Sequence, residues 1–320
     1  MKSGAKQRKM SVDTLFKGNT RTILAPMACY TDYAFRSICR DYAVGLTVTE
    51  MVSSKALTMG NDLSKKMLYR EQNDTPSFCQ IFGHEPSVMA DSVQLPEVRA
   101  YEGVDINMGC PVKKIVKTGD GSALLENPKL AGECITAVKQ ALGAKPLSVK
   151  FRLGVNDSKG AVDFAKMCRD SGADFITVHF RTRAQMYAGS ADYTLLTDIA
   201  KVGIPVFANG DVSTREQYLQ LLDMGAYGVA IGRGALGRPY IFAEIAGNPY
   251  EMDLQQVISR HTEMLLATFS DRVVCNEMKK HVSAYLKGRR NAKPTAIAVN
   301  SAHSTQEILE LVAKFVNCRT

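Results

Sequence analysis

Short apolar or β-branched segments recur along the first three quarters of the chain, and most intervals between them carry a helix-length amphipathic pattern. Eight of these segments are predicted to be strands: Thr22–Met27, Leu46–Thr49, Ser77–Phe82, Gly103–Asn107, Leu147–Phe151, Asp174–His179, Ile204–Ala208 and Tyr227–Ile231. Nearly continuous apolar strands that alternate with helices are typical of a parallel sheet covered on both faces. Eight such units predict an α/β fold, a closed (β/α)8 TIM barrel.

An open, doubly wound sheet is the alternative arrangement of alternating strands and helices. Such a sheet normally carries its phosphate-binding glycines directly after the first strand. Here the first strand ends in Ala25-Pro26-Met27-Ala28, without a Gly-x-Gly-x-x-Gly motif. We therefore favour the barrel.

The pattern changes after Phe242, and Asn248-Pro249 marks a break. Apolar residues then recur at helical spacing in three segments, Leu254–Thr268, Val274–Leu286 and Thr305–Val316. These segments predict a small C-terminal helical bundle packed beside the barrel. The chain is thus expected to comprise a basic N-terminal tail (residues 1–19), a barrel domain (20–247) and a helical domain (248–320).

The composition narrows the class of protein. Hydrophobic residues make up 45% of the 320 residues, an ordinary share for a globular protein, and the net charge of +8 permits an anionic partner. The eight Cys residues include no Cys-x-x-Cys pair, so we expect neither a disulfide framework nor a zinc site. A reducing, cytoplasmic compartment fits this usage. No His, Asp or Glu spacing suggests another metal site.

The chain carries no recognisable membrane or export signal. No apolar run approaches the roughly 20 residues that span a bilayer. Residues Met1–Met10 are basic and polar, and lack the apolar core of a signal peptide. We expect a disordered tail and no membrane contact. No protein partner is evident, and we expect a monomer, although the sequence itself does not give the oligomeric state.

Polar residues gather at the ends of the predicted strands, whereas the strand bodies are apolar. The ends are Met27, Glu50, Gln80, Asn107, Lys150, His179, Asn209 and Gly232-Arg233. Each residue alone has an ordinary explanation, since Lys150 could reach solvent and His179 could be a hydrogen-bonded core residue. In a TIM barrel, however, active residues collect at the C-terminal ends of the strands. Together these residues predict one site around one mouth of the barrel.

The segment Asn107-Met108-Gly109-Cys110-Pro111 ends the fourth predicted strand. Gly109 allows a sharp bend and Pro111 prevents the strand from continuing, so Cys110 is presented on a loop. Lys113, Lys114 and Lys117 follow, and then Gly119-Asp120-Gly121-Ser122. A thiol on a basic loop suggests chemistry on a polyanion. A buried structural Cys is the alternative, since free Cys is commonly buried.

The last two strands end in glycine-containing loops, Asn209-Gly210-Asp211 and Gly232-Arg233-Gly234. Loops after strands seven and eight of a TIM barrel frequently form a phosphate site. Exposed backbone N–H groups and the Arg233 guanidinium suit a phosphate. With Lys150 and Gln80 further round the rim, the loops suit a flat phosphorylated cofactor such as FMN, with Lys150 near the N1/O2 edge of the flavin.

A cationic run without an acid lies in the helical region: Lys279, Lys280, Lys287, Arg289, Arg290 and Lys293. Charge runs are often simply a solvated helix face. The strong bias to one sign favours phosphate binding over that alternative.

These motifs resemble those of the tRNA-dihydrouridine synthase family, in its bacterial FMN-dependent type and closest to the B-type branch. The matching stretches are Leu24-Ala25-Pro26-Met27 with Tyr30-Thr31-Asp32, Gln80-Ile81-Phe82-Gly83, Asn107–Pro111, Lys150–Gly154, Val178–Arg183, Ala208–Asp211 and Gly232–Pro239. The resemblance is strong over residues 20 to 245 and weaker beyond. Two positions depart from the family pattern, Cys29 and Phe180, which stand where the family usually or often has Gly.

The resemblance implies a reaction. Family members reduce the C5–C6 double bond of a uridine in tRNA: NADPH (or NADH) reduces the FMN, the flavin N5 gives a hydride to C6, and a Cys protonates C5. Matching by motif makes Cys110 that acid. The FMN contacts carry over to Pro26, Met27, Ala28, Gln80, Lys150, His179, Asn209, Gly210, Asp211, Gly232 and Arg233. Asn107 is expected to face flavin and uracil, and the D-loop is the implied target.

The target base must leave its stack, and contacts to the tRNA backbone must offset that cost. The candidate contacts are Lys113, Lys114, Arg152, Arg181, Arg183, Lys279, Lys280, Lys287, Arg289 and Arg290. The protonation of Cys110 stays open at this stage. Nearby lysines would lower the pKa of the thiol, whereas burial would raise it.

Two other functions compete. One is an FMN barrel that reduces a small pyrimidine, for which a basic helical domain would be unnecessary. The other is a non-catalytic RNA-binding protein on a barrel that has lost its activity, which the intact Cys110 and Lys150 disfavour. Flavin absorbance and dihydrouridine formation on unmodified tRNA would separate the three.

Overall fold

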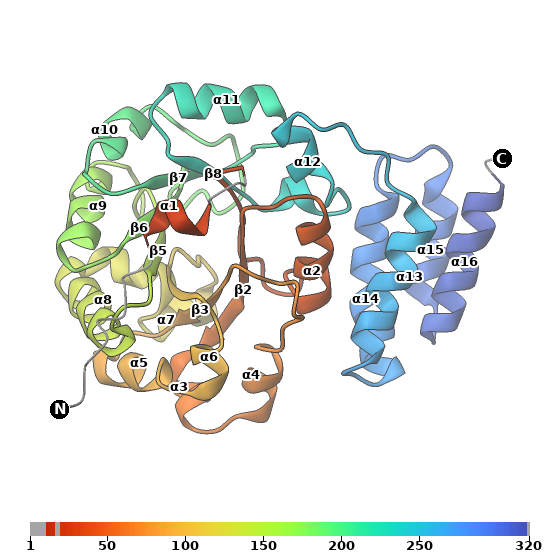
Figure 1. The fold of residues 1–320 in the computed structure, drawn as a ribbon, viewed down its shortest axis with the longest axis horizontal. Helices are drawn as coiled ribbons and strands as arrows, with labels where there is room; N and C mark the ends of the chain where they lie inside the picture. Colours follow the sequence, from red (N-terminus) through yellow and green to blue (C-terminus); the bar gives the residue numbers. More distant parts are fainter. Residues whose placement is uncertain (1–10, 17–19, 319–320) are drawn as a thin grey trace, which may run out of the picture.

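The computed structural model describes residues 11–16 and 20–318 of the chain. Its strands are β1 (Thr22–Leu24), β2 (Leu46–Ser53), β3 (Ser77–Phe82), β4 (Gly103–Met108), β5 (Leu147–Arg152), β6 (Phe175–His179), β7 (Val206–Asn209) and β8 (Gly228–Ile231). Each strand is parallel to the next, and β8 closes the ring on β1, with Ala230 opposite Ile23 (Figure 1). The predicted TIM barrel is confirmed.

The strand ends differ from the prediction at β1 and β2. The strand β1 stops at Leu24: the Ala25 N–H still bonds the Ile231 carbonyl at 2.8 Å, but Pro26 has no N–H to continue the ladder. The strand β2 runs on to Ser53, with an irregular register between Val48 and Met51. The predicted site residues after β1 therefore lie in a loop at the C-terminal end of the barrel.

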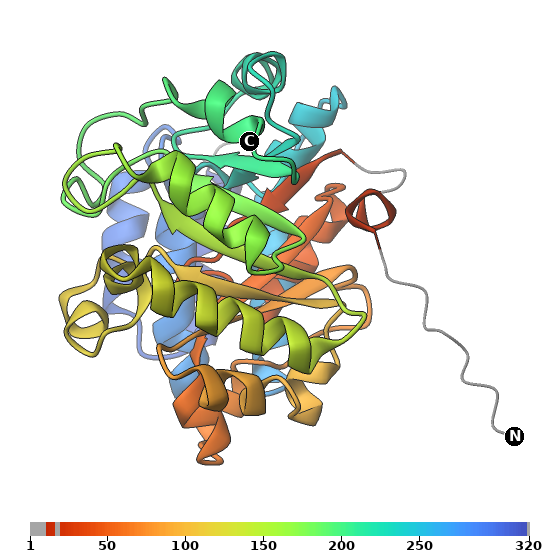
Figure 2. The same cartoon turned by 90° about the vertical axis from the view of Figure 1, so that its left-hand side faces the viewer.

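Helices surround the ring of strands and run alongside them (Figure 2). They are α2 (Tyr33–Asp41), α3 (Ser54–Thr58), α4 (Asp62–Lys66), α5 (Pro86–Ser92), α6 (Pro96–Arg99), α7 (Lys113–Lys117), α8 (Pro128–Leu142), α9 (Ala161–Asp170), α10 (Leu196–Ala200), α11 (Arg215–Asp223) and α12 (Ile241–Ala246), with 3-10 turns at Gly121–Glu126 and Arg233–Ala235. Side-chain N-caps start several of them. Thr214 and Gln217 form a capping box at α11, and Asp32 caps α2.

The prediction that residues 1–19 form a tail is wrong for residues 11–16, which fold over the barrel. A short helix, α1 (Val12–Leu15), lies across the centre of the ring of strands (Figure 1). Val12, Leu15 and Phe16 are buried against aromatic residues near the starts of β3, β6 and β7: Phe78, Phe175 and Phe207. The start of the tail, residues 1–10, lies outside the described part of the chain.

The C-terminal helices form a separate layer beside α2 (Figure 1). They are α13 (Leu254–Leu266), α14 (Asp271–Leu286), α15 (Ala292–Ser301) and α16 (Thr305–Asn317), and we call them the helical unit. The three predicted helices are present, and α15 is an addition. Tyr33 of α2 joins the layers, because its hydroxyl can donate to the Met264 carbonyl and accept from the Thr268 hydroxyl. Within the described residues, no helix has the length and apolar character needed to cross a membrane.

Candidate active site

A cavity of ≈ 860 Å³ opens where the strands end at their carboxyl side. All of the residues predicted to bind the cofactor line it: Pro26, Met27, Ala28, Gln80, Lys150, His179, Asn209, Gly210, Asp211, Gly232 and Arg233. Asn107, Cys110, Arg152 and Lys287 line it as well, the last of these from the helical unit. The closed barrel thus brings residues of all eight strand ends, with Met51 from β2, into one space with the residue that follows α14.

A buried hydrogen-bond chain orients the polar residues of β3 and β4. Asp105 accepts bonds from Ser148 Oγ (2.5 Å) and Gln80 Nε2 (2.6 Å). Gln80 Oε1 in turn accepts from Asn107 Nδ2 at 2.9 Å. Asn107 Oδ1 then accepts the backbone N–H groups of Gly109 (3.0 Å) and Cys110 (2.9 Å). The position of the Cys110 backbone is therefore tied to a carboxylate inside the barrel.

The loop around Cys110 is held on its other side too. Ser122 donates to the Cys110 carbonyl from both its hydroxyl (2.8 Å) and its backbone N–H (3.1 Å). Gly121 has a φ of 58°, and a Cβ there would lie 3.1 Å from Cys110 Cβ, so glycine allows the close approach. Burial raises the pKa of the Cys110 thiol and outweighs the opposing charges of Arg152 and Lys150. A raised pKa favours the protonated thiol at neutral pH.

Lys150 is one of the cations that line the cavity. Burial, with Arg152 nearby, lowers the pKa of Lys150 to about 8. Within residues 11–16 and 20–318, its amine has neither a salt bridge nor a hydrogen bond to another side chain. A buried amine without an acceptor favours a ligand with an anionic or electron-rich edge at this point.

His179 is a neutral side chain at the end of β6. Burial lowers its pKa strongly, and the neighbouring cations Lys150 and Arg152 lower it further. Its Nε2 lies 3.5 Å from Arg181 Nη1. Neutral His179 can accept or donate one hydrogen bond at the cavity wall without adding charge.

Three predicted tRNA contacts, all arginines, instead hold the loops of the site. Arg181 is 1% exposed, lies outside the cavity lining, and bonds the Gly189 carbonyl and Asp211. Arg152 lines the cavity, but its Nε and Nη1 donate to the carbonyls of Gly109, Thr182 and Met186. The guanidinium of Arg183 pairs with Glu126 at 2.7 Å. The geometry thus gives these arginines a supporting role.

The predicted lysine contacts scatter over two surfaces. Lys113 and Lys114 are exposed on α7, and Lys287 follows α14 at the cavity. Lys280 pairs with Glu277, and its ammonium lies 5.7 Å from the centre of the Tyr30 ring. Lys279, Lys280, Arg289 and Arg290 do not line the cavity.

Asp105, which bonds the cavity residue Gln80, and Tyr187, which lines the cavity, escaped the sequence analysis. Asp105 is an acid inside an apolar strand, two residues before Asn107, so both side chains point to the barrel interior. That spacing could have identified it. Tyr187 is 55% exposed in the loop after β6, and its ring lies 5.4 Å from the Arg152 guanidinium and 5.3 Å from that of Arg233. No periodicity marks such a loop residue in the sequence.

The loops after β7 and β8 fit a phosphate group. A Cβ at Gly210 would lie 2.7 Å from Ala191 Cβ, and one at Gly232 would lie 3.4 Å from Met27 Sδ. These glycines keep the backbone accessible beside Arg233, which is half exposed and bonds Asp211 at 2.9 Å. Burial raises the pKa of Asp211, but Arg181 overcomes this and holds it low. Together with the unpaired Lys150 of the same cavity, the residues present fit FMN.

Comparisons with solved structures show the fold. An old yellow enzyme homologue from Zymomonas mobilis superposes with a TM-score of 0.54 at 14% identity, over 74% of this chain and 91% of that one. A 2-naphthoyl-CoA reductase superposes with a TM-score of 0.56 at 11% identity over 72% of this chain, which spans half the length of that reductase. Both likenesses concern the architecture alone.

Sequence comparisons are more specific. A tRNA-dihydrouridine synthase B of Pseudomonas aeruginosa is 34% identical over 307 residues, or 92% of each chain. The protein of that name from Vibrio parahaemolyticus is 35% identical over 303 residues, 90% of this chain and 94% of its own. The family model described as "Dihydrouridine synthase (Dus)" matches residues 23–317. The chain therefore belongs to the dihydrouridine synthase family.

Proposed function

We propose that this flavin-dependent oxidoreductase uses FMN and NADPH to reduce the C5–C6 double bond of a D-loop uridine in tRNA. Family membership and the relatives named tRNA-dihydrouridine synthase B support the tRNA substrate. The observation that carries the chemistry is that a protonated thiol, Cys110, and an unpaired amine, Lys150, face one cavity.

The residues that would hold FMN are those of the cavity wall. Gly210, Gly232 and Arg233 suit the phosphate, Met27 offers an apolar face to the ring, and Lys150 suits the electron-rich edge. When bound and reduced, FMN supplies the hydride that the reaction needs.

Cys110 would supply the proton. Adding a hydride at C6 of uracil leaves C5 to take a proton, so the Sγ–H bond breaks as the C5–H bond forms. The resulting thiolate regains a proton from water after the product leaves. A raised pKa suits this role because the thiol must be protonated when the base arrives. Asn107, which holds the Cys110 backbone, would keep the donor in place.

The uridine must leave the RNA stack to enter the cavity, which costs a few kcal/mol. Backbone contacts from basic side chains can offset that cost. Lys287 is the best placed of the predicted contacts because it stands at the cavity on the helical unit. Lys113 and Lys114, exposed on α7, would act on the side of Cys110.

Single-turnover assays test the proposal. Purified protein should show flavin absorbance, and the flavin reduced by NADPH should be reoxidised by unmodified tRNA with one dihydrouridine formed per turnover. Mapping that product should place it in the D-loop, and NADH should reduce the flavin more slowly. Salt-insensitive turnover of free uracil with no reaction on tRNA would instead establish the small-pyrimidine reductase. Colourless protein that binds tRNA would establish the non-catalytic RNA binder.

A further inference from the structure

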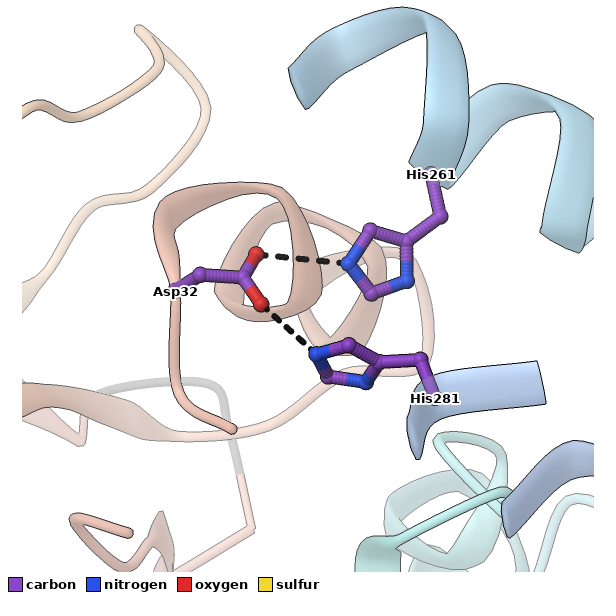
Figure 3. A group of neighbouring side chains, drawn as sticks. All are labelled: Asp32, His261 and His281. Atoms are coloured by element: carbon purple, nitrogen blue, oxygen red, sulfur yellow. Dashed lines mark hydrogen bonds and ion pairs between the residues drawn. The ribbon is translucent and has the colours of Figure 1, made fainter. Parts of the chain in front are cut away.

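Asp32 joins the barrel to the helical unit. It caps the start of α2, where its Oδ1 accepts the Phe35 N–H at 2.9 Å. The same carboxylate faces two imidazoles that come from the helical unit (Figure 3). His261 Nε2 of α13 lies 3.3 Å from Oδ1, and His281 Nε2 of α14 lies 2.9 Å from Oδ2.

This contact is buried. His261 and His281 are 0% and 1% exposed, and their ring centres lie 4.4 Å apart beside the ring of Phe35. Burial raises the pKa of Asp32, but His261 and His281 more than reverse this, so the carboxylate stays ionised. Burial lowers the pKa of His281, which favours the neutral ring. An anion between two imidazole donors is the arrangement that results.

The two imidazoles contact the carboxylate differently. The second ring nitrogen of His261 lies 3.4 Å from the Tyr285 hydroxyl, which leaves its Nε2–H for Asp32. The Asp32 Oδ2 to His281 Nε2 contact is short, yet neither atom has a well-directed hydrogen bond among the described residues. The contact between Asp32 and His281 therefore depends on the negative charge of the carboxylate more than on a well-directed hydrogen bond.

Asp32 also lies next to the cavity along the chain. Thr31 binds Met27 twice, through its hydroxyl to the Met27 N–H (3.1 Å) and through its N–H to the Met27 carbonyl (3.0 Å). Met27 lines the cavity, and so does Lys287, which ends the helix that carries His281. One short loop thus contacts the cofactor cavity at one end and the helical unit at the other.

We propose that Asp32 is a positioning residue for the RNA substrate. By holding His261 and His281, it fixes the helical unit so that Lys287 stands at the mouth of the cavity. This inference rests on the proposed function, because the helical unit is taken to bind tRNA. It assigns Asp32 to the delivery of the uridine and leaves cofactor binding to the cavity wall.

A divalent metal ion is the alternative occupant, because one ligand atom from each of these three side chains lies within 4.8 Å of the others. The clamp needs no metal, since each imidazole already faces its own carboxylate oxygen. Metal analysis of the purified protein separates the two. Less than a tenth of an equivalent of zinc, iron or manganese is expected, and a stoichiometric ion would overturn the clamp.

The variant Asp32→Asn removes the charge but keeps the helix cap, because Asn caps helices as well as Asp does. Its amide also places an NH2 group where one of the two carboxylate oxygens faces an imidazole. We expect kcat/KM for tRNA to fall about tenfold or more, mainly through KM, since a small misplacement far from the chemistry has effects of this size. FMN content and the rate of flavin reduction by NADPH should stay as in wild type.

The matched control is Asp41→Asn, which breaks the exposed pair with Arg260 at the same interface and should change kcat/KM less than twofold. Small-angle X-ray scattering of the protein without RNA reports separately how the helical unit docks on the barrel. Asp32→Asn should broaden the distribution of interatomic distances, and Asp41→Asn should not. If wild type forms no dihydrouridine, the proposed function fails while scattering still tests the clamp. Unchanged scattering and tRNA kinetics in Asp32→Asn, or loss of FMN in step with tRNA activity, would overturn the proposal.

Discussion

Burial acts in opposite directions on the two reactive groups of the cavity. It raises the pKa of the Cys110 thiol and lowers that of the Lys150 amine, so both are driven toward their neutral forms. Neutrality suits the role proposed for Cys110, since a thiol must carry a proton in order to donate it. Lys150 with a pKa of about 8 is still mostly charged at neutral pH and can respond to an anionic ligand.

Replacement of Cys110 tests its assignment as the acid. Cys110→Ala should leave FMN content and flavin reduction by NADPH intact. Reoxidation of the flavin by tRNA should slow by about 10²–10⁴, the usual worth of positioned proton transfer. Cys110→Ser should also be slow because a hydroxyl is a far weaker acid. Cys29→Ser, at an exposed thiol outside the cavity lining, is the control. Wild-type reoxidation in Cys110→Ala would make Cys110 a structural residue.

The lowered pKa of Lys150 should make the free energy of unfolding depend on pH. Its folded pKa of about 8 lies below the ordinary 10.5, so between these values the unfolded chain holds a proton that the folded chain has lost. The burial penalty is thus fully present below pH 8 and is relieved as pH rises toward 10.5. For cofactor-free protein, the gain should be on the order of 1–3 kcal/mol. Urea unfolding from pH 7 to 10 measures it, and Lys150→Met should abolish the gain.

The site residues that could be predicted from the sequence are those that belong to a recognisable local motif. The repeating pattern of strands and helices identified the residues at the strand ends. Every residue predicted to bind the cofactor lines the cavity. Asp32 with His261 and His281 could not be found in this way, because more than 200 residues separate α2 from its partners in the helical unit. Buried contacts between remote segments leave no local pattern.

At the scale of elements, the hydrophobic period predicted the strands but not every helix. The strands and the helices α13, α14 and α16 carry clear periods. The helix α15 was missed because its first turn holds Lys293 and Pro294 and reads as a basic loop. The helix α1 was missed because four residues are too few to show a period.

The helix α1 is expected to stabilise the barrel from the end opposite the cavity. The Phe16 ring centre lies 5.0 Å from that of Phe207, and Phe16 is 4% exposed. Phe16→Ala should lower the free energy of unfolding by about 3 kcal/mol, as for other buried aromatic truncations. Urea denaturation measures this, and FMN content and turnover below the transition should be unchanged. Leu219→Ala, at a 42% exposed position, is the control. A loss of flavin binding in Phe16→Ala would show that this end is coupled to the cavity.

The basic residues between Lys279 and Lys293 lie at different places in the structure. Lys287 stands at the cavity, whereas Lys293 is exposed on α15 outside it. Lys287→Ala should weaken tRNA binding and lower the slope of log K against log salt by about one, the value for one phosphate contact. Lys293→Ala should change both much less. Equal effects would mean that the run acts only through net charge, and a loss of FMN in Lys287→Ala would assign Lys287 to the cofactor.

At the scale of the whole molecule, the cavity is lined by both layers. The barrel supplies the cavity wall, and the helical unit supplies Lys287 and most of the other predicted cations of the C-terminal region. The two layers meet at α2, through Tyr33 and Asp32. The net charge of +8 suits an RNA partner over this combined surface.

The position of α1 has a kinetic consequence. Because Val12, Leu15 and Phe16 cover one end of the barrel, the described cavity is reached from the other end. A nicotinamide donor and a tRNA that both use this opening cannot occupy it together, so each must leave before the other binds. Initial rates measured while both substrates are varied should give parallel double-reciprocal lines, and oxidised nicotinamide should inhibit competitively against tRNA. Intersecting lines would mean that donor and RNA bind at the same time by separate routes.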